Sequence, residues 1–274
     1  RFIIFSCSII AVAVFVAVGS SMIRSGDGRT NRYDVEAGNN TYDNVVIENS
    51  KISEKNKIQN NQSMLDDIMN STQYPKQLKD LALKNEEALE FVYDYPTEHV
   101  KEHTIDLTEE ASMDSVPLFV QWDKRWGYEK YSGNFFAASG CGPTTLSMVV
   151  VYLTHNREAS PIAVAKYSKE AGYSVDGSGS SWTLISEGCM HYGVKAKTVA
   201  LDESRMKAEL DEGHPIVVNV GPGDFTDTGH FMVITGYDDE GFSINDPNSI
   251  EKSGKRWLFK NISSQIRAVW SMYV

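Results

Sequence analysis

Hydrophobic residues in the middle of the chain recur at the spacing of helices. Leu146, Val149, Val150 and Leu153 predict one helix that begins near Pro143, because the N–H that proline lacks would be unpaired in a first helical turn anyway. The same kind of pattern predicts further helices over residues 161–171, 182–192 and 203–212.

The pattern becomes strand-like in the last third of the chain. Residues 215–220 are mostly apolar, which is typical of a buried strand. Residues 231–237 and 242–246 flank the turn residues 238–241 and predict a hairpin, and a further strand is expected near 256–260. Helices followed by strands predict an α+β fold, in which a helical half precedes an antiparallel sheet half.

The N-terminal stretch from Phe2 to Ile23 contains no charged side chain and is long enough to span a bilayer as a helix. Residues 1–24 are therefore predicted to be a transmembrane anchor or a signal segment, and an uncleaved anchor is favoured. Ala17-Val18-Gly19 offers a cleavage site for the alternative. The rest of the chain is expected to be extracytoplasmic at the cell membrane, or secreted if the segment is cleaved.

Two further segments separate this stretch from the rest of the chain. Residues 25–70 are polar and predict a flexible tether, because their low hydrophobicity cannot offset chain entropy. Residues 71–112 predict a helical prefix, with apolar residues at helical spacing until Tyr95-Pro96 interrupts them. The prefix is expected to pack on a C-terminal domain of residues 113–274, to bind a partner, or to inhibit that domain.

Composition and charge narrow the range of partners. The 274 residues carry a net charge of -11 and have a pI near 5.0, which argues against nucleic acid or an anionic membrane surface as the main partner. The acidity fits a solvated extracellular protein.

Cys141 combines several features of a nucleophile. It lies in Ser-Gly-Cys-Gly-Pro-Thr (139–144), at a glycine-flanked turn that opens the helix predicted above. Backbone N–H groups at a helix start stabilise a thiolate and lower the pKa of the thiol. Cys189, in contrast, is expected to be buried and inert, and a disulfide between the two would consume the proposed nucleophile.

A base and an orienting group accompany this thiol. His230 opens the first strand of the predicted hairpin, and Asn245 and Asp246 end the second, so all three lie at the same end of the hairpin. A thiolate can attack a carbonyl, an imidazole can pass a proton to the leaving amine, and a third group can fix the imidazole tautomer.

The chain resembles the bacteriocin-processing-type branch of the papain-like cysteine peptidases, cysteine peptidase family thirty-nine and its relatives. The resemblance is carried by four ordered blocks: Val-Pro-Leu-Phe-Val-Gln-Trp-Asp-Lys-Arg-Trp-Gly-Tyr (116–128), Ser-Gly-Cys-Gly-Pro-Thr (139–144), Gly-Pro-Gly-Asp-Phe-Thr-Asp-Thr-Gly-His-Phe (221–231) and Asn-Asp-Pro-Asn-Ser (245–249). It implies a papain-like fold with Cys141 as nucleophile, His230 as general base and acid, and Asp246 as the orienting residue. Gln121 matches the glutamine of the oxyanion hole, although residues 122–140 separate it from Cys141, whereas the leader peptidases have only a few intervening residues.

The remaining expectations concern ligands. A cleft between the two halves is expected to carry the catalytic groups, with substrate-binding residues Trp122, Trp182, Gly140 and Gly229. No cofactor and no metal are expected, because the chain contains no Cys-x-x-Cys, His-Glu-x-x-His or calcium-loop spacing.

These features together predict a membrane-anchored extracytoplasmic cysteine peptidase that hydrolyses peptide or isopeptide bonds through an acyl-enzyme. Its expected partners are a peptide or protein substrate and, through the N-terminal segment, the membrane. A bacteriocin leader, a wall peptide and a secreted protein all remain open as substrates. Two alternatives remain: an acyl transferase with the same cysteine and histidine, and a catalytically silent peptide-binding module.

Overall fold

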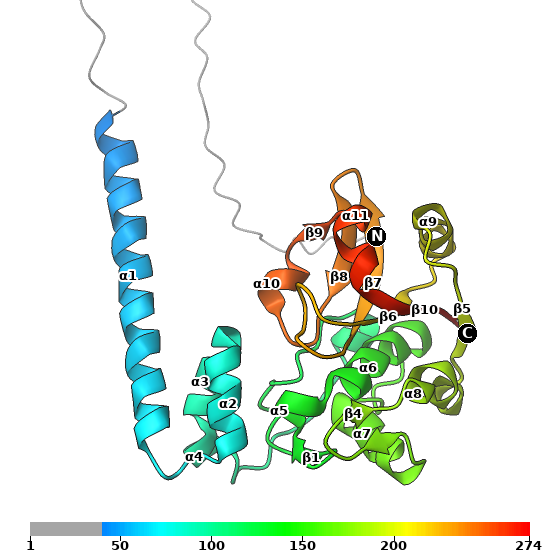
Figure 1. The fold of residues 1–274 in the computed structure, drawn as a ribbon, viewed down its shortest axis with the longest axis horizontal. Coiled ribbons are helices and arrows are strands. Elements are labelled where there is room, and N and C mark those ends of the chain that lie inside the picture. Colours follow the sequence, from blue (N-terminus) through cyan, green and yellow to red (C-terminus); the bar gives the residue numbers. More distant parts are fainter. Residues whose placement is uncertain (1–39) are drawn as a thin grey trace, which may run out of the picture. The chain divides into compact units, whose positions relative to one another are not determined.

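The strands of one antiparallel sheet all come from the last third of the chain (Figure 1). The computed structural model describes residues 40–274, with side chains from residue 51 onward. Within this range, the large sheet has six strands in the order β5-β10-β6-β7-β8-β9. Their bounds are β5 Lys195–Thr198, β6 Ile216–Val220, β7 His230–Asp238, β8 Gly241–Asn245, β9 Arg256–Trp257 and β10 Ile266–Tyr273.

The central strands are buried on both faces. In β7, Phe231 and Val233 belong to a hydrophobic cluster on one face, and Met232 and Ile234 to a second cluster on the other. Alternate side chains of a strand point to opposite faces, so a strand covered on both sides needs an unbroken apolar run. This requirement explains the apolar residues of β6, whose five residues are all buried. The one polar residue among them, Asn219, donates from its side-chain amide to the carbonyl of His230 at 3.2 Å.

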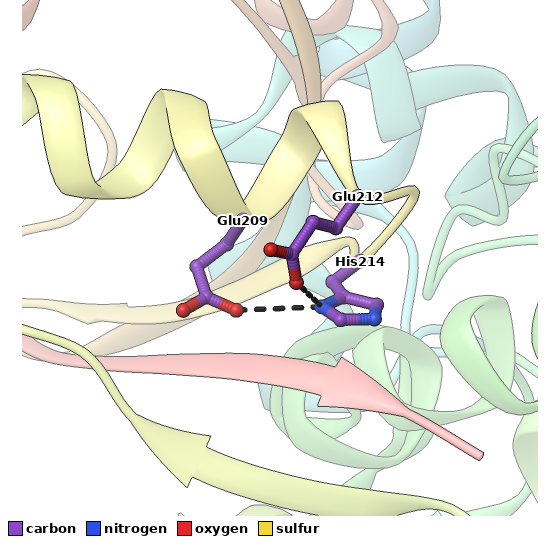
Figure 2. Close-up of side chains that lie close together, drawn as sticks. All are labelled: Glu209, Glu212 and His214. Carbon is purple, nitrogen blue, oxygen red and sulfur yellow. Dashed lines mark hydrogen bonds and ion pairs between the residues drawn. The ribbon is translucent and has the colours of Figure 1, made fainter.

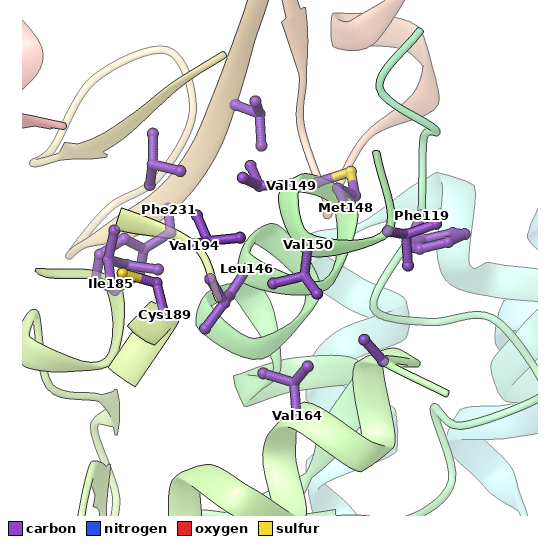
Figure 3. Packing of buried hydrophobic residues seen from close by; sticks show 14 of the residues in the cluster. Phe119, Leu146, Met148, Val149, Val150, Val164, Ile185, Cys189, Val194 and Phe231 are labelled. Carbon is purple, nitrogen blue, oxygen red and sulfur yellow. The ribbon is translucent and has the colours of Figure 1, made fainter. Parts of the chain in front are cut away.

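Helix α6 (Cys141–Thr154) covers the first face of the sheet. Residues 142–151 of α6 are all buried, and the hydroxyl of Thr145 donates a hydrogen bond to the carbonyl of Phe231 in β7 at 3.1 Å. Figure 3 shows Leu146, Val149 and Val150 of this helix within the core. The helix therefore holds its first residue, Cys141, against the start of β7.

Shorter helices complete the two layers. Helix α7 (Pro161–Glu170) packs on α6 and begins with a cap in which the hydroxyl of Ser160 accepts from the N–H of Ala163. Helices α9 and α11 contribute Met206 and Ile262 to the cluster on the second face. The remaining bounds are α5 Phe136–Ser139, α8 Thr183–Ser186, η3 Gly188–Tyr192, α9 Glu203–Asp211, α10 Ile250–Ser253, α11 Phe259–Ile262 and η4 Ser263–Gln265.

The predicted α+β fold, its helices over 161–171 and 203–212, the buried strand and the hairpin are confirmed. The single helix predicted over 182–192 is wrong, since a break at Glu187 separates α8 from η3. The strand expected near 256–260 is only two residues long and gives way to α11. Strands β5 and β10 were not predicted. Two small hairpins, β1–β2 (Lys130–Tyr131, Asn134–Phe135) and β3–β4 (Ser174–Val175, Gly179–Ser180), lie outside the large sheet.

The predicted flexible tether is wrong for residues 40–70, because Asn40–Asn70 form helix α1. The rest of the predicted tether, residues 25–39, lies outside the described residues. Near the end of α1, Met64, Leu65 and Ile68 pack into a third hydrophobic cluster with the helical prefix, and Ile68 is fully buried. That packing supplies the apolar burial that the polar composition of the segment does not suggest.

The helical prefix is several short helices rather than one. It contains α2 Lys76–Lys84, η1 Glu86–Ala88, α3 Leu89–Tyr93, α4 Tyr95–Glu98 and η2 Glu110–Ser112. The break falls at Asn85, which has an extended backbone and whose side-chain oxygen accepts from the N–H of Glu87. Asparagine favours such caps over helix interiors, which explains the interruption. As expected, the prefix packs on the catalytic domain, where Phe135 and Ala137 join its cluster.

The predicted transmembrane or signal segment, residues 1–24, lies outside the described residues. Among the helices of residues 40–274, none is both long and apolar enough to cross a membrane.

Candidate active site

The start of α6 and the start of β7 place Cys141 beside His230. Cys141 is the first residue of α6 and is partly buried. His230, the first residue of β7, lines the same cleft as Cys141, and its imidazole acts to lower the pKa of the thiol. The glycines on either side allow close packing: a Cβ on Gly140 would lie 2.6 Å from the ring of Phe136, and one on Gly142 would lie 2.6 Å from the hydroxyl of Ser180.

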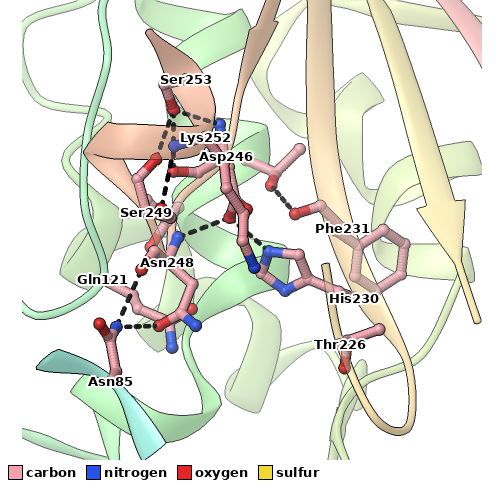
Figure 4. Close-up of polar contacts among 12 residues, drawn as sticks. Asn85, Gln121, Thr226, His230, Phe231, Asp246, Asn248, Ser249, Lys252 and Ser253 are labelled. Carbon is pink, nitrogen blue, oxygen red and sulfur yellow. Dashed lines mark hydrogen bonds and ion pairs between the residues drawn. The ribbon is translucent and has the colours of Figure 1, made fainter. Parts of the chain in front are cut away.

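Asp246 holds the other side of the imidazole (Figure 4). The Nε2 atom of His230 lies 2.7 Å from Oδ1 of Asp246, which is fully buried. Because Nε2 faces the carboxylate, Nδ1 is the ring nitrogen left to face Cys141. A thiol, an imidazole and a carboxylate thus form a continuous chain across the two halves of the fold.

The three groups shift the pKa of the thiol and of the imidazole in opposite directions. Burial acts to raise the pKa of Cys141, but the hydrogen bond and charge of His230, with the backbone N–H groups of Phe231 and Gly142, hold it below its ordinary value. Burial acts to lower the pKa of His230, whereas the charge and hydrogen bond of Asp246, followed by those of Cys141, raise it to about 10. The arrangement therefore favours a thiolate–imidazolium pair near neutral pH.

Asn245, which lies beside Asp246 in the sequence, faces elsewhere. Its side-chain amide donates to the carbonyls of Val116 and Pro117 at 3.0 and 3.1 Å. Of the two residues that the hairpin brings near His230, only Asp246 hydrogen-bonds the imidazole.

Gln121 reaches the same site despite its distance in the sequence. Its side chain is buried, and its Nε2 donates to the carbonyl of Ala137 at 2.7 Å. Its backbone N–H donates to the carbonyl of Pro247 at 2.7 Å, next to Asp246. The amide Nε2 carries two protons, so one remains for another acceptor. Gln121 lines the same cleft as Cys141 and His230.

Two adjoining clefts share Cys141 and Gly229. The first, of about 500 Å³, is lined by α2 of the prefix and by the loop of residues 223–229. The second, of about 690 Å³, is lined by residues 177–180, by Trp182 and by residues 219–222. Together they form a groove on both sides of the thiol.

The four predicted substrate-binding residues have different positions. Trp182 is 47% exposed and lines the second cleft, and Gly229 lines both. Trp122 and Gly140 line neither cleft. The indole of Trp122 packs against the prefix cluster and donates to the carbonyl of Asn248 at 3.2 Å, and Gly140 packs against Phe136.

One group of described side chains has donor atoms close enough for a metal ion, namely Glu209, Glu212 and His214 (Figure 2). The Glu209 carboxylate already accepts from Lys197 at 2.8 Å and from Ser271 at 2.7 Å, one partner on each oxygen. We read this group as an ion-pair network and assign no metal to it.

The comparison with family models decides the family. The model described as the Peptidase_C39 like family matches residues 113–274, which contain Cys141, His230, Asp246 and Gln121. The chain belongs to this family. The predicted resemblance is confirmed, and membership indicates a cysteine peptidase with a peptide substrate. No curated protein matches the chain.

Two solved structures are similar to this member of the Peptidase_C39 like family. One is the peptidase domain of Streptococcus ComA, a bi-functional ABC transporter involved in a quorum sensing pathway; it has 19% identity and a TM-score of 0.40, over 49% of this chain and 90% of that one. The other is a putative C39-like peptidase from Bacillus anthracis, with 17% identity and a TM-score of 0.35, over 62% of this chain and 97% of that one.

Sequence analysis missed the residues that support Asp246. The N–H of Asn248 donates to Oδ1 of Asp246 at 2.8 Å. The backbone N–H of Asp246 donates to the hydroxyl of Ser253 at 2.9 Å. The Asn-Asp-Pro-Asn-Ser block contains the first of these and signals a turn. Asn85 and Glu87 of the prefix also contact this region, and no motif identifies them.

Proposed function

We propose that the protein is a thiol peptidase that hydrolyses peptide or isopeptide bonds through a Cys141–His230–Asp246 triad. The observation that carries the proposal is the position of His230, between the thiol and a buried carboxylate, with the pKa of the thiol lowered and that of the imidazole raised. Membership of a peptidase family supports the same chemistry.

In the first half of the reaction, the Cys141 thiolate attacks the carbonyl carbon of the substrate and forms a tetrahedral oxyanion. The second amide proton of Gln121 and the backbone N–H of Cys141 are the donors proposed for this oxygen. The His230 imidazolium then gives the proton on Nδ1 to the leaving amine. The C–N bond breaks and a thioester remains on Cys141.

In the second half, neutral His230 takes a proton from water while the water oxygen attacks the thioester. The second tetrahedral intermediate collapses, the C–S bond breaks, and the carboxylic acid leaves as the thiolate re-forms beside the imidazolium. Asp246 holds Nε2 of His230 so that Nδ1 faces the sulfur in both halves of the reaction.

The groove supports a peptide as substrate. It extends on both sides of Cys141 and is lined by the loops of residues 177–180 and 223–229 and by the exposed indole of Trp182. A chain that crosses the thiol would have residues on both sides of the bond to be cut, which an endopeptidase requires.

The direct test is the hydrolysis of a peptide library, with products identified by mass spectrometry. The wild-type protein is expected to cleave a restricted set of bonds, and Cys141→Ala is expected to cleave none of them. Cleavage that persists in Cys141→Ala would exclude Cys141 as the nucleophile. An added amine distinguishes hydrolysis from acyl transfer, since a transferase would form the amide product in preference to the acid.

We further propose that the uncharged stretch Phe2–Ile23 anchors the enzyme with its catalytic domain outside the cytoplasm, because that stretch can span a bilayer core. Protease added to intact cells is expected to digest the catalytic domain. Digestion only after lysis would place the domain in the cytoplasm.

A further inference from the structure

The helical prefix lies outside the family-matched region, residues 113–274, but contacts the turn that carries Asp246. We call residues 246–251 the aspartate turn. Within the family-matched region, the outside contacts to this turn include the backbone N–H of Gln121 and the indole of Trp122. Two residues of the prefix, Asn85 and Glu87, add further hydrogen bonds to it.

Asn85 holds the middle of the aspartate turn. Its Nδ2 donates to the backbone carbonyl of Asn248 at 2.9 Å and to the side-chain oxygen of the same residue at 3.1 Å (Figure 4). The backbone N–H of Asn248 in turn donates to Oδ1 of Asp246 at 2.8 Å. Asn85 is thus linked through Asn248 alone to the carboxylate that hydrogen-bonds His230.

Glu87 holds the end of the aspartate turn. Its Oε1 accepts from the hydroxyl of Ser249, and its Oε2 accepts from the backbone N–H groups of Ile250 and Glu251 at 2.7 and 3.1 Å. Every partner is a donor, so both oxygens of the Glu87 side chain act as acceptors.

The prefix is itself firmly held. The N–H of Glu87 donates to the side-chain oxygen of Asn85, which joins the two residues. On either side of them, Leu78, Leu89 and Val92 are buried in a cluster that also includes Ala137, the residue whose carbonyl binds Gln121. The same hydrophobic cluster therefore holds the prefix residues that contact the aspartate turn and the residue that binds Gln121.

The prefix borders the groove rather than filling it. Helix α2 contributes Gln77, Asp80 and Lys84 to the wall of the first cleft, and that cleft remains open at about 500 Å³ with Cys141 at its surface. This geometry argues against an inhibitory plug.

We propose that Asn85 and Glu87 are positioning residues of this peptidase, which hold the aspartate turn so that Asp246 stays against His230. The proposal rests on the proposed function. Its physical consequence follows from the raised pKa of His230, of which Asp246 is the main cause. A looser turn lowers the pKa of His230, so the imidazolium is lost at a lower pH and the thiolate loses its charge partner.

The experiment compares Glu87→Ala and Asn85→Asp with the control Glu86→Ala. Asn85→Asp keeps the oxygen that caps Glu87 but removes the donors to Asn248. Glu86 is the residue before Glu87, carries the same kind of side chain, and lies in the same short helix η1. Its carboxylate binds the side chain of Asn61 and not the aspartate turn. Turnover is followed against pH on a cleaved library peptide, and iodoacetamide labelling of Cys141 near neutral pH gives a readout that needs no substrate.

Both test variants are expected to lower kcat by roughly tenfold. This is the size of loss seen at metal sites when a residue that orients a histidine through a second residue is removed. They should also move the alkaline limb of the pH profile to lower pH and slow the labelling of Cys141, while Glu86→Ala changes none of these. In the Asp246→Ala background, Glu87→Ala should cause no further loss, because its effect runs through the missing carboxylate.

An unshifted alkaline limb in Asn85→Asp, or a full further loss in the double variant, would overturn the positioning role. If Glu87→Ala does not fold, as judged by its melting curve, Asn85→Asp carries the test alone. Failure of the proposed function is recognised separately, because it would show as activity in Cys141→Ala or as a wild-type thiol that labels like an ordinary cysteine.

Discussion

The two cysteines of the described region occupy similar local positions and have opposite chemistry. Cys141 follows Gly140 as the first residue of α6, and Cys189 follows Gly188 near the start of η3. Backbone N–H groups act to lower the pKa of both thiols. The pKa of Cys141 is nevertheless below its ordinary value, whereas burial raises that of Cys189 to about 11.

The difference lies in what surrounds each thiol. Cys189 is fully buried among Leu146, Ile185 and Val194, as Figure 3 shows. Burial raises the pKa of its thiol, and only backbone N–H groups oppose that effect. Cys141 opens onto the groove and has His230 beside it. A helix start and a preceding glycine are therefore not enough to lower the pKa of a thiol. The pKa falls only where a charged partner outweighs the effect of burial.

The largest expected effect comes from removing that partner. His230→Ala should lower turnover by more than about 10⁴-fold and slow the labelling of Cys141 near neutral pH, because the thiolate loses its imidazolium. His191→Ala is the matched control. This exposed histidine lies two residues after Cys189 in η3, stacks on Tyr167 at 4.1 Å, and should leave turnover unchanged when it is replaced. Steady-state kinetics would check both. Equal losses in the two variants would mean that His230 acts only on folding.

Asp246→Ala should have the next largest effect. We expect a loss in kcat of roughly ten- to thousandfold, because the imidazole remains but is less often correctly oriented. The alkaline limb of the pH profile should move to lower pH, since the carboxylate is what raises the pKa of His230 to about 10.

Asn245→Ala is the control for this variant, because Asn245 binds Val116 and Pro117 and not the imidazole. Asn245→Ala should keep turnover within about a few-fold of wild type, because the lost hydrogen bonds do not involve His230. A fully active Asp246→Ala together with an inactive Asn245→Ala would move the orienting role to Asn245.

Gln121→Ala separates the oxyanion hole from the thiolate. It should lower kcat by roughly a hundredfold, the usual loss for one donor to the oxyanion. Labelling of Cys141 should not change, because alkylation forms no oxyanion. Full turnover in Gln121→Ala would show that another donor fills the role, and slowed labelling would show that the variant disturbs the thiol itself.

The smallest effect is expected at the other cysteine. Cys189→Ala removes a buried sulfur from the core and should lower the free energy of unfolding by about 1 kcal/mol, with turnover unchanged. Denaturant unfolding and the library assay would measure the two quantities. A large loss of turnover without a loss of stability would contradict the inert role of Cys189.

The local parts of the fold and site were predictable from the sequence. The hairpin that brings His230 and Asp246 together spans few residues, and its turn chemistry and apolar runs are visible in the chain. Ser160 before Pro161 likewise marks the start of α7 where the structure has it.

The non-local parts were not predictable in the same way. Strand β10 pairs with β6 and β5, which are far from it in the sequence. No tight turn joins it to either partner, so the local pattern does not predict the pairing. Gln121 reaches the site only because residues 122–140 fold back and place Ala137 against it. Asn85 and Glu87 contact a turn more than 150 residues away, which local pattern cannot reveal.

The central claim is that Cys141 is a thiolate paired with His230 near neutral pH, and the pH dependence of its alkylation by iodoacetamide tests it most directly. Peptide mass spectrometry would follow Cys141 and Cys189 in the same sample. Cys141 should label rapidly at about pH 6 to 7 and much faster than Cys189, and in His230→Ala its labelling midpoint should rise toward the ordinary thiol value of about 8.5. A wild-type midpoint already at that ordinary value, unchanged in His230→Ala, would contradict the account.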